Sequence, residues 1–321
     1  MDLRTTLFGL ALAGATLGHV SLAHGFCRTM TGREAGDPSG TNRCAGWNER
    51  EQQACCPYGK PLYWKNACMG YSLQKDASRQ VSLADAESVF SRAFETWTKT
   101  TCSADAASRV SIQASYLGPV ECGTVGYNSD GANQNVIVFR DTAWDHMDAT
   151  NTLGLTTVRY NPDSGEIYDA DMEINAYQSR PLSIANAVAP GAVDLLSIAT
   201  HEVGHVLGFA HSAEAGATMF ASYQGVTMRD LSSDDTTGIC GVYKPDQTRM
   251  TAAGPLPADA CDPTPRHGYT SACVSPSSSS GDGGGCSVPG DESRRTPSLL
   301  SVGLSALSLV LLRRLRATPS I

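Results

Sequence analysis

The amino-acid sequence predicts an α+β fold, and three observations carry this prediction. Several short segments have the apolar alternation or the continuous apolar run that is typical of β-strands. One segment, 82–99, has helical apolar spacing, and a second helical segment surrounds residue 201. The chain has 321 residues, of which 41% are hydrophobic. It is therefore long enough for one sizeable core with additional segments at its ends.

Five segments are predicted to be strands. In 110–117 the apolar residues alternate, as in a strand with one buried face. In 135–140 they form a short continuous run, as in a buried strand. Two further segments flank the turn sequence Asn161-Pro162-Asp163-Ser164-Gly165, which predicts a strand–turn–strand unit. In chain order the predicted strands are 62–71, 110–117, 135–140, 153–160 and 166–175.

The segment 82–99 is predicted to be a helix that packs on the core. Ser82 and Asp85 have the spacing of a capping box, which marks the start of a helix. The apolar residues that follow share one helical face, and they are Leu83, Ala86, Phe90, Ala93, Phe94 and Trp97. This pattern favours a buried face over an aromatic binding surface.

The most specific feature is the motif H-E-x-x-H-x-x-G-x-x-H, which begins at His201. On a helix, His201 and His205 leave the same face one turn apart, which suits two imidazoles that bind one zinc ion. Glu202 lies beside them, where a general base is needed. Gly208 is expected to end the helix and to bring His211 round as a third ligand. A fourth position left for water is typical of catalytic zinc. The alternative is a buried helix whose histidines satisfy core hydrogen bonds.

The motif and the residues after it carry a resemblance to a known family. Met219, in Ala217-Thr218-Met219-Phe220, resembles the Met-turn that follows this motif in metzincins. Ser212, directly after the third histidine, is the matrixin choice. Tyr223 falls where matrixins have a tyrosine that lines the pocket for the residue after the scissile bond. Over roughly residues 60–245, the chain is therefore identified as a member of the matrixin-like zinc metalloendopeptidases.

The resemblance implies a fold and a reaction. The fold is a twisted, mostly parallel sheet with an antiparallel edge strand, packed on two long helices, with a third helix after the Met-turn. The edge strand, which begins near Leu153, would pair with extended protein or peptide substrates through backbone hydrogen bonds. Zinc would activate a water, and Glu202 would accept its proton and pass it to the leaving amine. Two alternatives remain: a surface adhesive or structural module with a vestigial zinc site, and a zinc hydrolase for another class of substrate.

A second metal is predicted from three alternating acidic residues, Asp169, Asp171 and Glu173. On a strand these carboxylates point to one face and repel one another unless a cation lies among them, so they predict a calcium site. A solvated acidic face is the alternative. Only one zinc is expected, because few histidines lie outside the motif in the mature chain, namely His24, His146 and His267.

The N-terminal part is predicted to be exported. Residues 1–23 have the pattern of a secretory signal peptide, with a membrane anchor as the alternative. The chain has 11 cysteines, and without Cys286 their number is even, which predicts disulfides in an oxidising compartment. The adjacent Cys55 and Cys56 should pair with different partners. Proximity in sequence suggests the pairs Cys102–Cys122 and Cys261–Cys273.

The predicted domains are a cysteine-rich N-terminal extension at 24–60, the zinc peptidase domain at 61–245, a linker rich in proline, serine and glycine at 246–297, and a C-terminal segment at 298–321. The extension contains Arg43-Cys44-Ala45-Gly46, a partial match to the cysteine switch of matrixin zymogens. It is expected to be stapled to the peptidase domain.

The C-terminal segment is predicted to be a sorting signal and not part of the enzyme. A glycine-flanked Cys286, the apolar run Leu299–Leu312 and the cluster Arg313-Arg314-Leu315-Arg316 together resemble the myxobacterial C-terminal sorting signal. The resemblance implies processing near Cys286 and display on the surface or outer membrane of a Gram-negative bacterium. A simple C-terminal anchor is the alternative. The net charge of −8 speaks against nucleic acid as a partner. We expect a monomer that contacts a membrane only through this tail.

Overall fold

The computed structural model describes residues 26–32, 55–56, 58–103, 108–121, 123–146, 148–177 and 180–273, together with the backbone of 284–289. The predicted signal peptide, Cys44 and the apolar C-terminal run lie outside these residues. Within the described part, no helix is both long enough and apolar enough to cross a membrane.

In the part of the chain that the structure describes, three α-helices form where the sequence supplies apolar faces and polar caps. Helix α2 (Leu83–Thr98) starts at Ser82, whose side chain accepts a hydrogen bond from the amide of Asp85, as predicted. Helix α3 (Leu195–Val206) starts at Asp194 and is buried along its whole length. Helix α4 (Ser233–Val242) starts with a complete capping box, and a short 3₁₀ helix, η1 (Gly225–Arg229), precedes it.

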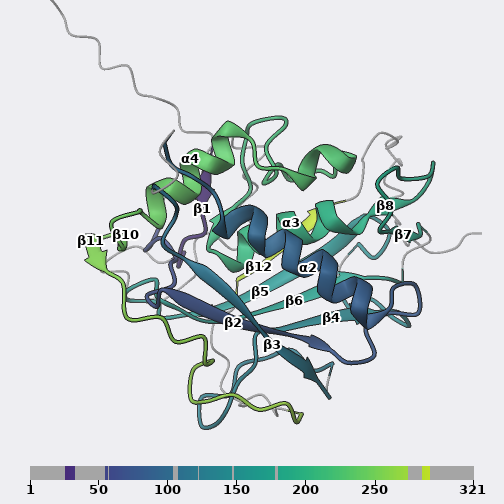
Figure 1. The fold of residues 1–321 in the computed structure, drawn as a ribbon, viewed down its shortest axis with the longest axis horizontal. Coiled ribbons are helices and arrows are strands. Elements are labelled where there is room, and N and C mark those ends of the chain that lie inside the picture. The colour runs from purple at the N-terminus through teal and green to yellow at the C-terminus, as the bar shows by residue number, and fades with distance from the viewer. Residues whose placement is uncertain are drawn as a thin grey trace, which may run out of the picture. The chain divides into compact units, whose positions relative to one another are not determined.

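The main sheet has six strands in the order β12-β5-β6-β4-β2-β3. Its members are β2 (Cys68–Gln74), β3 (Gln113–Val120), β4 (Val136–Arg140), β5 (Thr152–Tyr160), β6 (Ile167–Asn175) and β12 (Gly284–Pro289). The pairs β2–β3, β2–β4 and β4–β6 are parallel, whereas β5 is antiparallel to both β6 and β12. Helices α2 and α3 lie side by side over the sheet (Figure 1). The α+β prediction is confirmed.

The first strand starts later than predicted. Residues 62–67 of the predicted strand 62–71 make only isolated bridges, such as Tyr63 with Glu166. The reason is local, because the Asn66 side chain accepts hydrogen bonds from the amides of Cys68 (2.9 Å) and Asp262 (3.0 Å) and so interrupts regular pairing. Strand β2 therefore begins at Cys68.

Three pairs of short strands lie outside the main sheet. Strand β1 (Cys27–Arg28) pairs with β9 (Phe209–Ala210), and β7 (Leu182–Ser183) pairs with β8 (Val193–Asp194). Strand β10 (Thr248–Thr251) pairs with β11 (Gly254–Pro257). The first pair attaches part of the N-terminal extension directly to the segment between the second and third motif histidines.

Part of the predicted linker 246–297 belongs to the folded unit instead. Arg249 on β10 is fully buried, and its guanidinium donates to the carbonyls of Trp64 (2.9 Å), Asn66 (3.1 Å) and Ser111 (3.0 Å). The guanidinium also lies 5.0 Å from the ring centroid of Tyr243. A composition rich in small residues predicted a flexible segment, but one buried arginine with several carbonyl partners orders this stretch.

The disulfides correct both pairings that sequence proximity suggested. Cys102 pairs with Cys240 and not with Cys122, and Cys261 pairs with Cys68 and not with Cys273. The fold brings these partners together across separations of 138 and 193 residues. The third described disulfide joins Cys27 and Cys55, so the adjacent Cys55 and Cys56 have different partners, as predicted.

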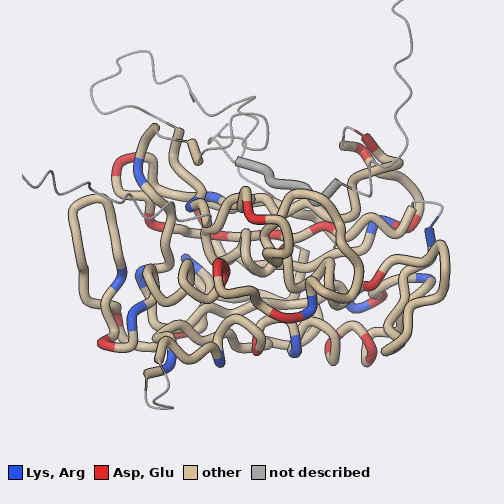
Figure 2. Tube along the Cα trace, turned by 90° about the horizontal axis from the view of Figure 1, so that it is seen from above, with Lys and Arg blue, Asp and Glu red and all other residues tan. Residues whose placement is uncertain are grey.

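Charged residues of both signs are interspersed along the described chain, as Figure 2 shows. One of their ion pairs joins Lys65 to Asp259 at 3.2 Å, with both side chains exposed. Such exposed pairs add little to stability. The charges that matter for the site are the buried ones described next.

Candidate active site

The start of helix α3 is held by a buried ion pair. The carboxylate of Asp194 accepts hydrogen bonds from the amide (2.9 Å) and the hydroxyl (2.6 Å) of Ser197. The guanidinium of Arg229 donates to both of its oxygens, at 2.6 and 2.7 Å. A bidentate pair with a fully buried carboxylate sets the position of the helix from which two motif histidines project.

The structure brings the three motif histidines together. His201 and His205 lie on α3 with their Nε2 atoms 3.1 Å apart. The helix then ends, and Gly208 takes a φ of 90°, with Leu62 O only 3.0 Å from where a Cβ would lie. The chain turns there, and His211 reaches the other two. One ligand nitrogen from each ring lies within 4.8 Å of the others, and among the described residues this is the group that could hold a metal.

Hydrogen bonds fix which ring nitrogen faces the centre of this group. Nδ1 of His201 lies 2.6 Å from the carbonyl of Thr218, and Nδ1 of His205 lies 2.7 Å from the carbonyl of Phe209. Because a carbonyl only accepts, each Nδ1 must donate, which leaves each Nε2 with a lone pair for a metal. Burial lowers the pKa of His201 and brings that of His205 to about 4, so both rings are neutral.

These donors fit zinc. Neutral imidazole nitrogen is a preferred zinc ligand, and Zn–N distances of about 2.0–2.1 Å in a tetrahedron put two ligand nitrogens about 3.3 Å apart. The His201–His205 separation of 3.1 Å is close to that value. In His201 and His205, the ring nitrogen that faces away from the centre donates to a backbone carbonyl. This is the usual arrangement of histidines that bind zinc through their other nitrogen.

Glu202 lies beside the histidines, between helix α3 and strand β5. Its Oε2 accepts a hydrogen bond from the Thr156 hydroxyl at 2.6 Å, whereas its Oε1 has no hydrogen-bond partner among the described residues. Burial raises the pKa of Glu202 to about 8. Gly154 makes room for the carboxylate, since a Cβ there would lie 2.6 Å from Oε1. The arrangement presents one buried carboxylate oxygen that is able to accept a proton.

Met219, the residue of the predicted Met-turn, packs against α3 at Gly204. A Cβ on Gly204 would lie 2.2 Å from the Met219 sulfur, so the glycine inside the motif allows this close approach. The carboxylate of Asp235 accepts from the amides of Thr218 (2.7 Å) and Met219 (3.1 Å). Since the Thr218 carbonyl contacts His201, helix α4 is connected to the metal centre through this turn.

Tyr223 is placed at the start of α3. Its hydroxyl accepts a hydrogen bond from the amide of Asp194 at 2.7 Å, and the ring packs partly buried against the main core. Burial raises the pKa of this hydroxyl. The contact anchors the tyrosine beside the N-cap of α3, and its role in a substrate pocket stays a prediction.

The three acidic residues predicted to bind calcium are buried on β6. Asp171 accepts from the amides of Gly126 (2.6 Å) and Val136 (2.9 Å). Both oxygens of Glu173 have protein partners, which are Arg140 and His146. In Asp169, Oδ2 has no hydrogen-bond partner among the described residues. Burial, and then the charge of Asp171, raise the pKa of Asp169, while burial raises that of Asp171 to about 6. Calcium binding at these carboxylates stays a prediction.

Several residues that shape the site were missed by sequence reasoning. Thr156 and Gly154 on β5 contact Glu202, and Gly204 makes room for the Met-turn. Asp194 had a readable signal, because an aspartate three residues before Ser197 and directly ahead of an apolar run is typical of a helix N-cap. The other three contacts join segments far apart in the chain, and no local pattern marks them.

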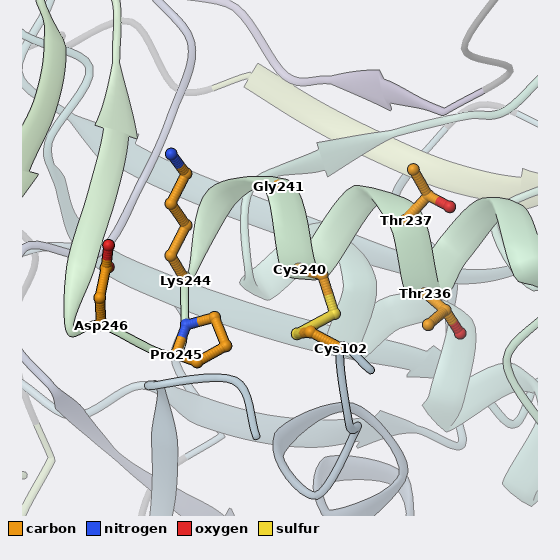
Figure 3. A pocket seen from close by; sticks show the side chains of 8 residues that line it. All are labelled: Cys102, Thr236, Thr237, Cys240, Gly241, Lys244, Pro245 and Asp246. Atoms are coloured by element: carbon orange, nitrogen blue, oxygen red, sulfur yellow. A yellow bond between two sulfur atoms is a disulfide. The ribbon is translucent and has the colours of Figure 1, made fainter. Parts of the chain in front are cut away.

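The surface also has a pocket that none of the motif histidines lines. It is lined by the Cys102–Cys240 disulfide, by residues of α4, and by Lys244, Pro245 and Asp246 after the helix, as Figure 3 shows. The disulfide here fastens the end of α4 to the segment after α2, which is a structural role.

The fold and the three-histidine centre together define the class of proteins that hold zinc through an H-E-x-x-H-x-x-G-x-x-H motif. A comparison with protein families supports this class, since the family described as matrixin matches residues 63–244, more than half of the 321 residues. The chain belongs to the matrixin family. Matrixins are zinc-dependent, so zinc is the metal that the histidine group is suited to hold.

Individual relatives agree with this family. Interstitial collagenase of Bos taurus is 27% identical over 202 residues, which are 62% of this chain and 36% of the relative. Metalloendoproteinase 1-MMP of Arabidopsis thaliana is 28% identical over 189 residues, 58% of this chain and 46% of the relative. Neutrophil collagenase of Homo sapiens is 24% identical over 203 residues, 63% of this chain and 38% of the relative. The chain thus spans less than half the length of each of these relatives.

Proposed function

We propose that this protein hydrolyses peptide bonds in extended protein substrates, with zinc held by His201, His205 and His211 and with Glu202 as the general base. The observation that carries the proposal is the convergence of the three imidazoles next to a buried carboxylate, one oxygen of which accepts no hydrogen bond from a described residue. The zinc is the proposed resident cofactor, and protein or peptide chains are the proposed substrates.

Zinc bound by these histidines would polarise the scissile carbonyl and make a water molecule acidic enough to ionise near neutral pH. Glu202 takes the proton of that water through Oε1 and delivers it to the leaving amine. The Thr156 hydroxyl keeps Oε2 occupied, so it orients the carboxylate for this transfer.

Substrate is proposed to bind along β5, and the residue after the scissile bond to contact Tyr223. Backbone pairing with a strand holds a peptide regardless of its sequence, which suits an endopeptidase. Tyr223 lies at the N-terminal end of α3, the helix that carries the metal ligands. The name collagenase belongs to the relatives.

Export and display at the cell surface are also proposed. Disulfides such as Cys68–Cys261 and Cys27–Cys55 form and persist in oxidising compartments, which supports the signal peptide predicted at 1–23. The tail around Cys286 and residues 298–321 is proposed to act as the sorting signal that its sequence resembles. The folded enzyme is proposed to be a monomer that contacts the membrane only through that tail.

The alternative of an adhesive module with a vestigial zinc site is less well supported. A site that had lost its function would be free to lose the general base, the glycine that makes room for it, or the hydroxyl that orients it. Glu202, Gly154 and Thr156 are all present and in contact. The alternative makes its own prediction, which is zinc binding without peptide cleavage.

The test compares two alanine variants of carboxylates in the same segment of the chain. Glu202→Ala is expected to bind one zinc ion per chain and to lose cleavage of an unstructured protein. Glu214→Ala, at an exposed carboxylate, is the matched control and should retain both. Full cleavage by purified Glu202→Ala would contradict the assignment of the base. Zinc binding by the wild-type chain without any cleavage would favour the adhesive module.

A further inference from the structure

The outer edge of strand β5 is occupied by a segment of the protein's own C-terminal part. Strand β12 (Gly284–Pro289) pairs antiparallel with β5 from Val158 back to Thr152. It is the last strand of the main sheet and also contacts helix α3 (Figure 1). The edge proposed to bind extended substrates therefore already holds an extended peptide.

The register places the middle of this peptide opposite the proposed base. Cys286, Ser287 and Val288 pair with Thr156, Leu155 and Gly154, in that order. On β5, Thr156 donates to one oxygen of the Glu202 carboxylate, and Gly154 leaves room for the other. The carboxylate thus contacts β5 at Gly154 and Thr156, the two neighbours of Leu155. Leu155 is the residue that pairs with Ser287 of β12.

The connection to the body of the protein favours binding within one molecule. The described body ends at residue 273, where Cys273 is in a disulfide, and β12 begins at Gly284. A short connection rich in serine and glycine keeps the local concentration of the attached segment high, in the millimolar range for short flexible linkers. Gly284 and Gly285 add no side chains that could hinder pairing at the start of the strand.

We propose that β12 is an intramolecular substrate, and that the enzyme cleaves its own chain at one of the two peptide bonds that flank Ser287. The inference rests on the proposed function, because it needs the same zinc centre and the same base. One water is consumed: its oxygen bonds to the carbonyl carbon of Cys286 or Ser287, and the peptide C–N bond breaks. Glu202 carries the proton to the new amine, on Ser287 or Val288. The products are a carboxylate and an amine, and no oxidant or further reactant is required.

Cleavage there would change the protein in two ways. It would separate the folded peptidase from residues 288–321, which contain the apolar run 299–312 and the arginine cluster. It would also divide the strand that occupies β5, so that each piece pairs through fewer backbone hydrogen bonds and leaves more readily. Strand β5 then becomes open to other peptides, and cleavage of a separate substrate accelerates.

The first experiment uses the full chain prepared without metal. Zinc is added, and intact mass and N-terminal sequencing follow the release of a fragment that begins at Ser287 or Val288. The rate is expected to be unchanged over a hundredfold dilution, as required for cleavage within one molecule. Glu202→Ala should stay intact. A wild-type chain that stays intact while it cleaves a separate peptide would overturn self-cleavage and leave the proposed peptidase standing. A chain that binds zinc but cleaves neither would overturn both.

A second experiment needs neither zinc nor turnover. Hydrogen exchange of the β5 amides is measured in Glu202→Ala and in the same protein with Ser287→Pro, since proline within a strand removes a donor and disrupts pairing. Exchange of those amides in 152–158 that face β12 should accelerate at least tenfold with Ser287→Pro, while those that face β6 stay protected. The matched control is Ser280→Pro, outside the strand, which should leave exchange and cleavage unchanged. In the active chain, Ser287→Pro should abolish self-cleavage and retain cleavage of a separate peptide. Equal β5 exchange in the Ser287→Pro and Ser280→Pro proteins would contradict the pairing.

Discussion

Asp235 offers a strong test of how helix α4 supports the metal centre. Its carboxylate is buried and accepts from the amides of Thr218 (2.7 Å), Met219 (3.1 Å) and Ser232 (2.9 Å), and from the Ser232 hydroxyl (2.7 Å). Asp235→Ala removes the acceptor for all of these donors. A buried amide without a partner costs about 1–3 kcal/mol, so three of them lower the free energy of unfolding by about 3 kcal/mol or more.

The same change should weaken zinc binding, although Asp235 is not a ligand. The Thr218 carbonyl holds the His201 ring, and Asp235 holds the Thr218 amide. Residues that orient zinc ligands typically change metal affinity by about 10–100-fold, and we expect about tenfold for this indirect contact. The control is Asp234→Ala on the same helix, where a half-buried carboxylate loses its bond to the Ser212 hydroxyl at a cost of about 1 kcal/mol.

Urea unfolding of the metal-free proteins and competition with a zinc-binding dye measure the two effects separately. Asp235→Ala should be less stable than Asp234→Ala by at least about 2 kcal/mol, because it leaves backbone amides without a partner. If the two variants unfold at the same urea concentration and bind zinc equally, the proposed route from α4 to His201 is wrong.

Two further predictions concern buried carboxylates. Asp169 and Asp171 have pKa values raised by burial, that of Asp171 to about 6, so the folded state binds their protons more tightly than the unfolded state. The contribution of Asp171 to stability is therefore greatest below pH 4 and declines as pH rises to about 6, by on the order of 3 kcal/mol, and the contribution of Asp169 also declines as pH rises. In calcium-free buffer, Asp169→Asn should unfold at a higher temperature than wild type at pH 7 and at a similar one at pH 4; lower stability at pH 7 would contradict this. Asp194→Ala should cost about 3–5 kcal/mol in urea unfolding, because it leaves Arg229 without its buried partner, and Asp194→Asn less, since it keeps a cap acceptor. Equal losses would show that the cap bond adds nothing.

The sequence predicted features that arise from local rules. Helix α2 begins directly after Ser82, because the serine caps the helix and the residues that follow supply an apolar face. The histidines meet because helical spacing and one glycine at a positive φ determine their geometry. The turn at Asn161–Gly165 follows from similar chemistry, with Gly165 at a φ of 82°.

Long-range pairs could not be predicted in the same way. Cys68 meets Cys261 across 193 residues, and the burial of Arg249 depends on carbonyls from distant segments. The pairing of β12 with β5 also joins residues more than a hundred positions apart. Such contacts are selected by packing of the whole chain, and apolar periodicity in one segment carries no information about its partner.

The central claim is that the three histidines hold a zinc ion that the protein uses to cleave peptide bonds. The most direct measurement combines zinc content with cleavage of an unstructured protein, for the wild-type chain, His211→Ala and the control His267→Ala. We expect one zinc per chain in wild type and control, with cleavage lost on chelation and restored by zinc, and loss of both zinc and cleavage in His211→Ala. Cleavage that persists in metal-free protein, or zinc that binds equally to His211→Ala, would contradict the account.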